Sequence, residues 1–121
     1  MNFESLEFNN KEPIYLQIVE WVKKSIASGD LQPGDKLPSV REMSTLIKVN
    51  PNTLQRAYTE LERQQITVTK RGMGSFVSTV DGHVSNLKQQ LAKEIIEKFL
   101  SDLSAAGITK AEAIKLIEEM E

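Results

Sequence analysis

The sequence has no cysteine and only one histidine among its 121 residues. Without cysteine, disulfides, thiolate chemistry and cysteine-ligated zinc are all excluded. His83 stands without a nucleophile or a pair of carboxylates at the spacing of a known motif. HExxH, P-loop and dinucleotide-binding glycine patterns are also absent. We therefore expect a protein that is not an enzyme, with no metal and no cofactor.

Long hydrophobic runs are missing as well. No apolar stretch approaches the roughly 20 residues that span a bilayer, and the first ten residues, MNFESLEFNN, contain no apolar core of a signal peptide. The length predicts one domain, or one small domain with an appendage. We expect a cytoplasmic protein with no membrane partner.

The charge is unevenly distributed along the chain. The net charge is −2, but residues 36–74 carry seven Lys and Arg residues against three Glu, an excess of four positive charges. We call residues 36–74 the basic island. An excess of this size is compatible with an ordinary solvated surface or with an anionic partner, so geometry has to decide between them.

Three helices are expected before residue 64. Ile14, Ile18, Val22 and Ile26 recur every four residues after Pro13, which predicts a helix that ends at Gly29. Ser39 and Glu42 form a capping-box pattern at the start of a short helix, and Asn50 caps the next one. The expected inward residues of these two helices are Val40, Met43, Leu46, Ile47, Leu54, Ala57, Tyr58 and Leu61. About three residues separate the two helices, which is typical of a helix-turn-helix.

A β-hairpin and two more helices are expected in the second half. Residues 66–69 alternate apolar and polar side chains, KRGMG reads as a turn, and residues 75–78 return as a second strand. A long helix is expected from Val84, with Gly107 just past its end, and a capping box at Thr109 and Glu112 begins the last helix, with Ala113, Leu116, Ile117 and Met120 inward. The predicted fold is mostly α with a small β-hairpin: a winged helix-turn-helix followed by a two-helix C-terminal dimerisation segment.

The side of residues 50–63 that faces away from the apolar stripe carries amides and arginines. Asn and Gln can read adenine in the major groove, and Arg can read guanine. Arg41 works against the dipole of its own first turn, which favours a phosphate partner over a salt bridge to Glu42 or Glu60. Lys70 and Arg71 supply cations at the hairpin tip, where a solvated turn is the alternative. The residues expected to bind DNA are Ser39, Arg41, Asn52, Thr53, Gln55, Arg56, Lys70, Arg71 and Gly72.

The motifs PIYLQI, LPSVRE, NPNTLQRAYTELE and RGMGSFV, in this order over residues 13–78, resemble the winged-helix domain of the GntR family of bacterial transcription regulators. The NPNT opening and short tail look like the YtrA-like branch, which lacks the large effector-binding domain of other members. The resemblance implies a homodimeric repressor in which Arg41, the start of the recognition helix and Gly72 contact DNA. Pro51 and Gln55 stand where many members have Arg, so the operator sequence is not transferable, and Gln64-Gln65 replaces a common acid–Gly pair.

The tail is expected to join two copies of the chain. Two amphipathic helices of this length do not make a stable core by themselves. We expect 1–12 to form an N-terminal arm, 13–79 the DNA-binding domain and 80–121 the dimerisation tail. The expected dimer interface consists of Leu87, Leu91, Ile95, Phe99 and Leu103.

The expected function is a sequence-specific regulator, a repressor, that binds a palindromic operator in double-stranded DNA as a homodimer. An unidentified small-molecule effector is possible, but nothing in the sequence designates its site. A winged-helix adaptor that binds protein or RNA is the alternative.

Overall fold

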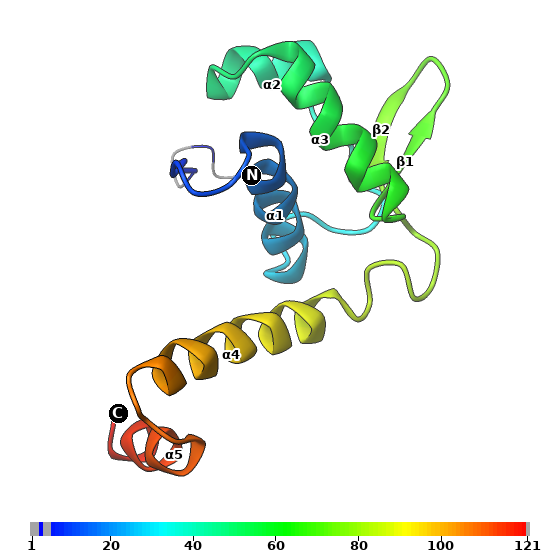
Figure 1. The fold of residues 1–121 in the computed structure, drawn as a ribbon. Helices are drawn as coiled ribbons and strands as arrows, with labels where there is room; N and C mark the ends of the chain where they lie inside the picture. Colours follow the sequence, from blue (N-terminus) through cyan, green and yellow to red (C-terminus); the bar gives the residue numbers. More distant parts are fainter. Residues whose placement is uncertain (1–2, 4–5, 121) are drawn as a thin grey trace. The chain divides into compact units, whose positions relative to one another are not determined.

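The computed structural model describes residue 3 and residues 6–120. Its elements are α1 (Ile14–Ala27), α2 (Val40–Ile47), α3 (Pro51–Arg63), β1 (Thr67–Lys70), β2 (Gly74–Val77), α4 (Leu87–Ala105) and α5 (Lys110–Glu119) (Figure 1). Contacts divide the chain into two compact units, Met1–Lys88 and Gln89–Glu121. The expected fold class, mostly helical with one small hairpin, is confirmed.

The core of the first unit lies between α1 and α3. Ile18 and Val22 of α1 are fully buried, as are Leu54 and Leu61 of α3. Their spacings of four and seven residues place each pair on one helical stripe, so the two stripes face each other. α3 also contacts α2 and β1, which makes it the central element of this unit (Figure 1).

The turn between α2 and α3 is held by local bonds. Ser39 and Glu42 form the expected capping box, and Asn50 caps α3 by accepting from the N–H of Asn52 at 2.8 Å. α2 ends at Lys48, which adopts a left-handed conformation with φ 55°. The Ser44 hydroxyl then donates to the Val49 carbonyl at 2.6 Å. These bonds fix the angle at which α3 leaves α2.

One residue of α2 that is expected to be buried, Leu46, is exposed. Leu46 is 51% exposed, whereas Met43 is completely buried. At 100° per residue, Leu46 is rotated about 100° from Ile47 and about 60° from Met43, at the edge of the buried stripe. A helix of eight residues buries only a narrow stripe against α3, so this edge position stays in solvent.

α3 ends in a Schellman motif that uses glutamine where glycine is usual. Ile66 donates its N–H to the Leu61 carbonyl at 3.0 Å, and Gln65 donates to Glu62 at 2.9 Å. Gln65 occupies the left-handed position with φ 63°. Leu61 and Ile66 are both buried, which supplies the hydrophobic contact of the motif. The turn therefore keeps its geometry despite the replacement of glycine.

β1 and β2 pair antiparallel, with Thr67 opposite Val77 and Lys70 opposite Gly74. Each strand is displaced by one residue toward the turn relative to the expected 66–69 and 75–78. We call residues 67–77 the wing. The ring of Phe3 lies 5.6 Å from that of Trp21 in α1, while residues 1, 2, 4 and 5 of the expected arm are outside the described part of the chain.

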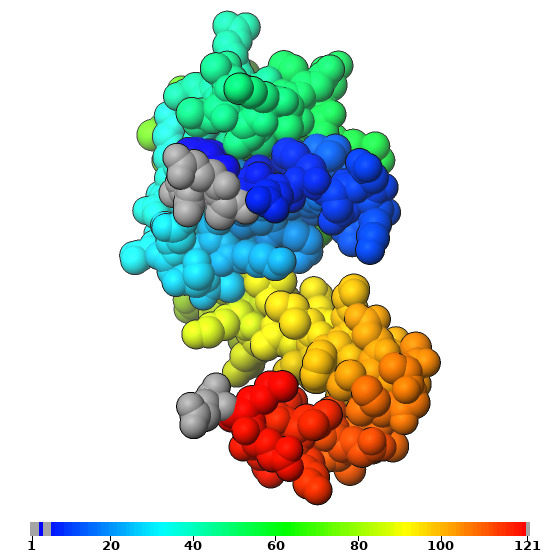
Figure 2. Space-filling model, turned by 90° about the vertical axis from the view of Figure 1, so that its left-hand side faces the viewer, coloured from blue at the N-terminus to red at the C-terminus, as the bar shows by residue number. Residues whose placement is uncertain are grey.

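In the second unit, α5 follows the C-terminal end of α4 after a turn at residues 106–109 (Figure 1 and Figure 2). Gly107 has φ 79°, and Ile108 donates to the Leu103 carbonyl at 2.9 Å, which confirms the expected Schellman motif. The capping box of Thr109 and Glu112 is also confirmed. α4 begins at Leu87 and not at Val84, because residues 81–86 form turns.

The expected inward face of α5 is largely exposed. Ala113 is buried, but Leu116 and Ile117 are 49% and 53% exposed, and Met120 is 71% exposed. The four lie on one face, as the helical period requires. The expectation of burial was wrong because no second layer covers this face within the described part of a single chain.

Gln65 provides a test of the backbone conformation. Gln65→Gly should raise the free energy of unfolding by about 0.5–1 kcal/mol, because it removes a left-handed penalty of about 1–2 kcal/mol and adds some chain entropy to the unfolded state. Gln64→Gly is the matched control, since Gln64 has φ −79° and gains nothing from glycine. Thermal melts should move in opposite directions. A Gln65→Gly protein that melts below the wild type would contradict the explanation.

Candidate nucleic-acid interface

α3 has one buried and one exposed face. Ala57 and Tyr58 are buried, while Asn52, Gln55 and Arg56 are exposed. The Gln55 amide donates to the Thr59 hydroxyl at 3.4 Å, a long bond that leaves its carbonyl oxygen free to accept. Thr53, also among the expected contacts, is half-buried. The amide-bearing face of α3 is thus available to a ligand.

The first turn of α2 presents Ser39 and Arg41. The Ser39 hydroxyl accepts from the Glu42 N–H at 3.1 Å, and its own proton remains available for donation. The Ser39 N–H bonds to the Glu42 carboxylate and lowers the pKa of that carboxyl. Arg41 is exposed, and its side chain makes no ion pair within the described residues.

Glu60 does not pair with Arg41, because its carboxylate is already bound by Arg63. Arg63 donates from Nε to its carboxylate at 2.8 Å and from a terminal nitrogen at 2.5 Å. These bonds, with a third from Gln64, lower the pKa of Glu60 to about 2. The charge of Arg63 is therefore already balanced, and that of Arg41 is not.

Arg56 is held by an aromatic ring. Its guanidinium carbon lies 4.0 Å from the centre of the Tyr15 ring, in the first turn of α1. Contact of this kind restricts the side chain while its N–H groups stay able to donate. Arg56 therefore connects α1 to α3 as well as contributing positive charge.

The wing tip carries the remaining expected residues. Lys70 and Arg71 are exposed, and Gly72 has φ 77° with no atom within 4 Å of the position that a Cβ would occupy. The Lys70 ammonium lies 4.6 Å from the centre of the Phe76 ring. The tip is thus narrow and cationic.

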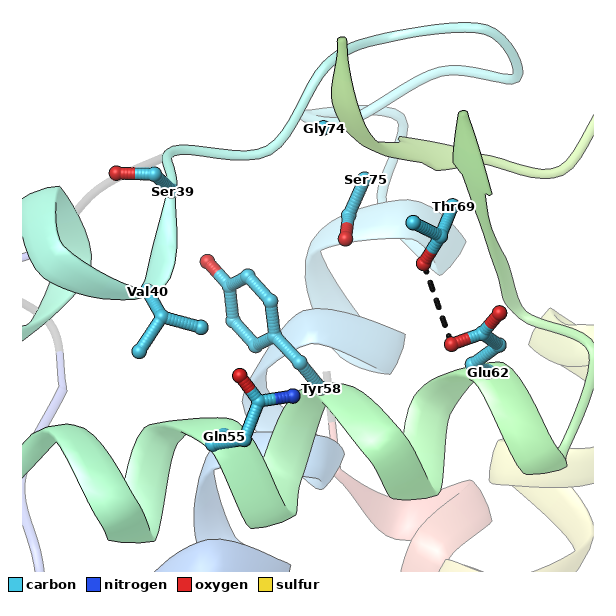
Figure 3. A pocket seen from close by; sticks show the side chains of 8 residues that line it. All are labelled: Ser39, Val40, Gln55, Tyr58, Glu62, Thr69, Gly74 and Ser75. Carbon is cyan, nitrogen blue, oxygen red and sulfur yellow. Dashed lines mark hydrogen bonds between the residues drawn. The ribbon is translucent and has the colours of Figure 1, made fainter. Parts of the chain in front are cut away.

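A pocket joins these three elements (Figure 3). It is lined by Ser39, Val40, Gln55, Tyr58, Glu62, Thr69, Gly74 and Ser75. The structure therefore brings residues from α2, α3 and the wing to one concave surface. Within the basic island, this surface is where a phosphate backbone and base edges could meet the protein together.

Two residues that hold this surface were not identified from the sequence as part of it. The Tyr58 hydroxyl donates to the Pro38 carbonyl at 2.5 Å, and burial raises the pKa of the phenol. The Thr69 hydroxyl donates to the Glu62 carboxylate at 3.2 Å, which fastens the wing to α3 (Figure 3). The helical period indicates that Tyr58 is inward, but no sequence signal gives the partner of its hydroxyl.

The residues expected at a dimer interface differ in exposure. Leu87 and Leu91 are 2% and 6% exposed within a single chain, and Leu103 is half-buried. Ile95 and Phe99 are 58% and 42% exposed. Only the latter two retain a large apolar surface to bury against another chain.

Residue 3 and residues 6–120 contain no group of three or more His, Asp or Glu side chains placed to hold a metal ion. No helix of this part of the chain is both long and apolar enough to cross a membrane.

The profile of the family described as "Bacterial regulatory proteins, gntR family" matches residues 14–77, from α1 to the end of the wing. The chain belongs to the GntR family. The matched range covers all of the elements that border the pocket, and it ends before the two tail helices. The members of this family are transcriptional regulators, as the resemblance of the motifs implied.

Curated relatives extend the similarity into the tail. The chain is 44% identical over 112 residues to the "Uncharacterized HTH-type transcriptional regulator YhcF" of Bacillus subtilis (strain 168), covering 93% of each chain. It is 46% identical over 91 residues to the "HTH-type transcriptional repressor YtrA" of the same organism, covering 70% of each. This similarity confirms the expected likeness to YtrA.

A solved structure shows the same fold over almost the whole length. It is a "GntR family transcriptional regulator from Listeria monocytogenes", with 40% identity and a TM-score of 0.85. The match covers 94% of this chain and 100% of that one. The fold that this chain shares with that regulator therefore includes both the winged helix and the helical tail.

Proposed function

We propose that this GntR protein is a repressor that acts in the cytoplasm and binds a palindromic operator in duplex DNA as a homodimer. The observation that carries the proposal is the arrangement of α3. One face is buried against α1 and α2, and the opposite face exposes Asn52 and Gln55 beside a cationic wing. A helix presented in this way fits the major groove.

The proposed contacts divide into two kinds. Asn52 and Gln55 read base edges, since both carry an amide that can pair with adenine. Ser39, Arg41, Arg56 and the wing tip contact phosphates, as do Thr53 and the N–H groups at the start of α3. Phosphate contacts set the register of the protein, and the two amides supply the sequence preference.

The dimer is proposed to form through residues 80–121. Ile95, Phe99, Leu116 and Ile117 are between 42% and 58% exposed. A monomer would leave this apolar surface in water, which costs about 25 cal/mol for each Å². Two-fold symmetry would then present two copies of α3 about 34–36 Å apart, one turn of DNA.

The sign of regulation rests on similarity to YtrA, which is named a repressor. A repressor needs no surface beyond the DNA interface and the dimer interface, because occupation of the operator is sufficient to block transcription. A winged helix that binds protein or RNA is the competing reading, and the first experiment separates the two.

Salt dependence of duplex binding tests the proposed function. Affinity for a duplex selected from random DNA should fall with a log–log slope of several units, because each neutralised phosphate adds about 0.9 to the slope. Fluorescence anisotropy at several salt concentrations gives this slope. The selected sites should contain two inverted half-sites. A protein that selects no sequence, or that prefers single-stranded RNA, is not the proposed regulator.

Gln55→Ala should relax base preference at one position in each half-site. The expected cost at the preferred base is about 1–3 kcal/mol, because one base contact is removed. Thr59→Ala is the matched control, as it removes the hydroxyl that the Gln55 amide contacts without removing the amide. Sequencing of selected DNA measures the preference. An unchanged preference for Gln55→Ala would remove Gln55 from the base-reading residues.

Phe99→Asp should convert the dimer to monomers, because it places a charge in the proposed apolar interface. Gln90→Asp adds the same charge to an exposed position of α4 and is the control. Leu91 is unsuitable for this test, since it is already buried within one chain. Sedimentation equilibrium measures the mass. Dimers of the Phe99→Asp variant with the affinity of the wild type would place the interface elsewhere.

A further inference from the structure

The segment before α2 pairs with β2 and so adds a short extended stretch to the wing. Leu37 donates its N–H to the Ser75 carbonyl at 2.9 Å, and Val77 donates to the Asp35 carbonyl at 2.8 Å. These bonds pair Lys36 with Phe76 in an antiparallel bridge. Residues directly opposite each other on antiparallel strands point to the same side of the sheet. The Lys36 side chain therefore belongs to the face that carries Phe76.

That face is opposite to the pocket. Side chains alternate along a strand, and Thr69 and Ser75 point into the pocket (Figure 3). The register then places Lys70 and Phe76 on the other side, which we call the outer face of the wing. Lys36 joins them through its bridge to Phe76.

Gly74 leaves room for Lys36 on the outer face. A Cβ built on Gly74 would lie 3.1 Å from Lys36 Cε and 3.9 Å from its Nζ. The lysine stem thus passes directly over Gly74, and Gly74 is the residue paired with Lys70. Lys70 in turn lies over the ring of Phe76. The two ammonium groups therefore share one small face, and packing limits the freedom of both side chains.

The outer face has an excess of positive charge. Lys36, Lys70 and Arg71 are exposed, and within the described residues none of them makes an ion pair. Glu42 is the acidic group that Lys36 influences, since Lys36 contributes to the lowered pKa of Glu42 after the two bonds from Ser39. Lys36 also lies three residues before Ser39, the N-cap of α2. Lys36 therefore bridges the interval between the two proposed phosphate-contacting elements, α2 and the wing.

We propose that Lys36 is a further DNA-binding residue, which contacts a backbone phosphate from the outer face of the wing. With Lys70 it forms a pair of cations on the outer face of the wing, Arg71 follows at the tip, and Gly74 keeps room for the Lys36 stem. The ligand is the phosphate backbone of duplex DNA, without regard to base. The assignment rests on the proposed function of the winged domain.

The test compares the salt dependence of four variants with that of the wild type on one selected duplex. Lys36→Gln should weaken binding roughly three- to tenfold for each lost contact near 0.1 M salt, and it should reduce the log–log slope by about 0.9 for each lost contact, or about 1.8 in a dimer. Lys36→Arg should keep the slope of the wild type. Lys24→Gln makes the same change of net charge on an exposed residue of α1, so it controls for long-range attraction. Lys70→Ala with Arg71→Ala gives the reference loss for the wing tip.

Measurements of base preference and of thermal stability complete the experiment. Lys36→Gln should select the same sequences as the wild type, because a phosphate contact carries no sequence information. Its thermal melt should match that of Lys24→Gln, since the bridge to Phe76 uses backbone atoms only. If the slope of Lys36→Gln equals that of the wild type, or if Lys24→Gln reduces the slope equally, the contact does not exist. Absence of salt-dependent duplex binding by the wild type would instead contradict the proposed function itself.

Discussion

The winged domain depends on the burial of one side of α3. Leu54, Ala57, Tyr58 and Leu61 are at most 6% exposed, and α1, α2 and β1 all contact this helix. Each neighbour therefore takes its position from the same apolar stripe. Because a helix has one continuous surface, burial of this stripe determines which side chains remain in solvent. Asn52 and Gln55 are exposed for that reason.

Hydrogen bonds between distant segments then set the angles of the elements around α3. Tyr58 holds the segment before α2 through the Pro38 carbonyl, and Thr69 holds the wing through Glu62. Tyr58 is 6% exposed, and a buried hydroxyl that loses its partner costs about 1–3 kcal/mol, so its bond restricts alternative arrangements more than the exposed bond of Thr69 does. The pocket between α2, α3 and the wing follows from these restraints. A surface that must fit a duplex benefits from this rigidity, because ordering costs on binding are lower.

The two units differ in how much of their apolar surface they bury. The first unit buries most of its large apolar side chains in its own core, whereas α4 and α5 leave Ile95, Phe99 and Ile117 between 42% and 58% exposed. Two helices alone offer too little area to cover both of their apolar faces. Similarity to YhcF and to the Listeria regulator extends into this tail, so the two tail helices are a feature that the chain shares with these proteins.

The sequence by itself determined the local structure: the capping boxes at Ser39 and Thr109, the stripes of α1 and α3, and the glycine that ends α4. These features depend on residues a few positions apart, whose chemistry acts before the chain is folded. The tertiary structure decided which side chains from different elements come into contact. The contact of Arg56 with Tyr15, the bond from Tyr58 to Pro38 and the place of Lys36 beside Gly74 join residues far apart in the chain. Their geometry depends on how helices and strands pack, and periodicity along one element contains no information about its neighbours.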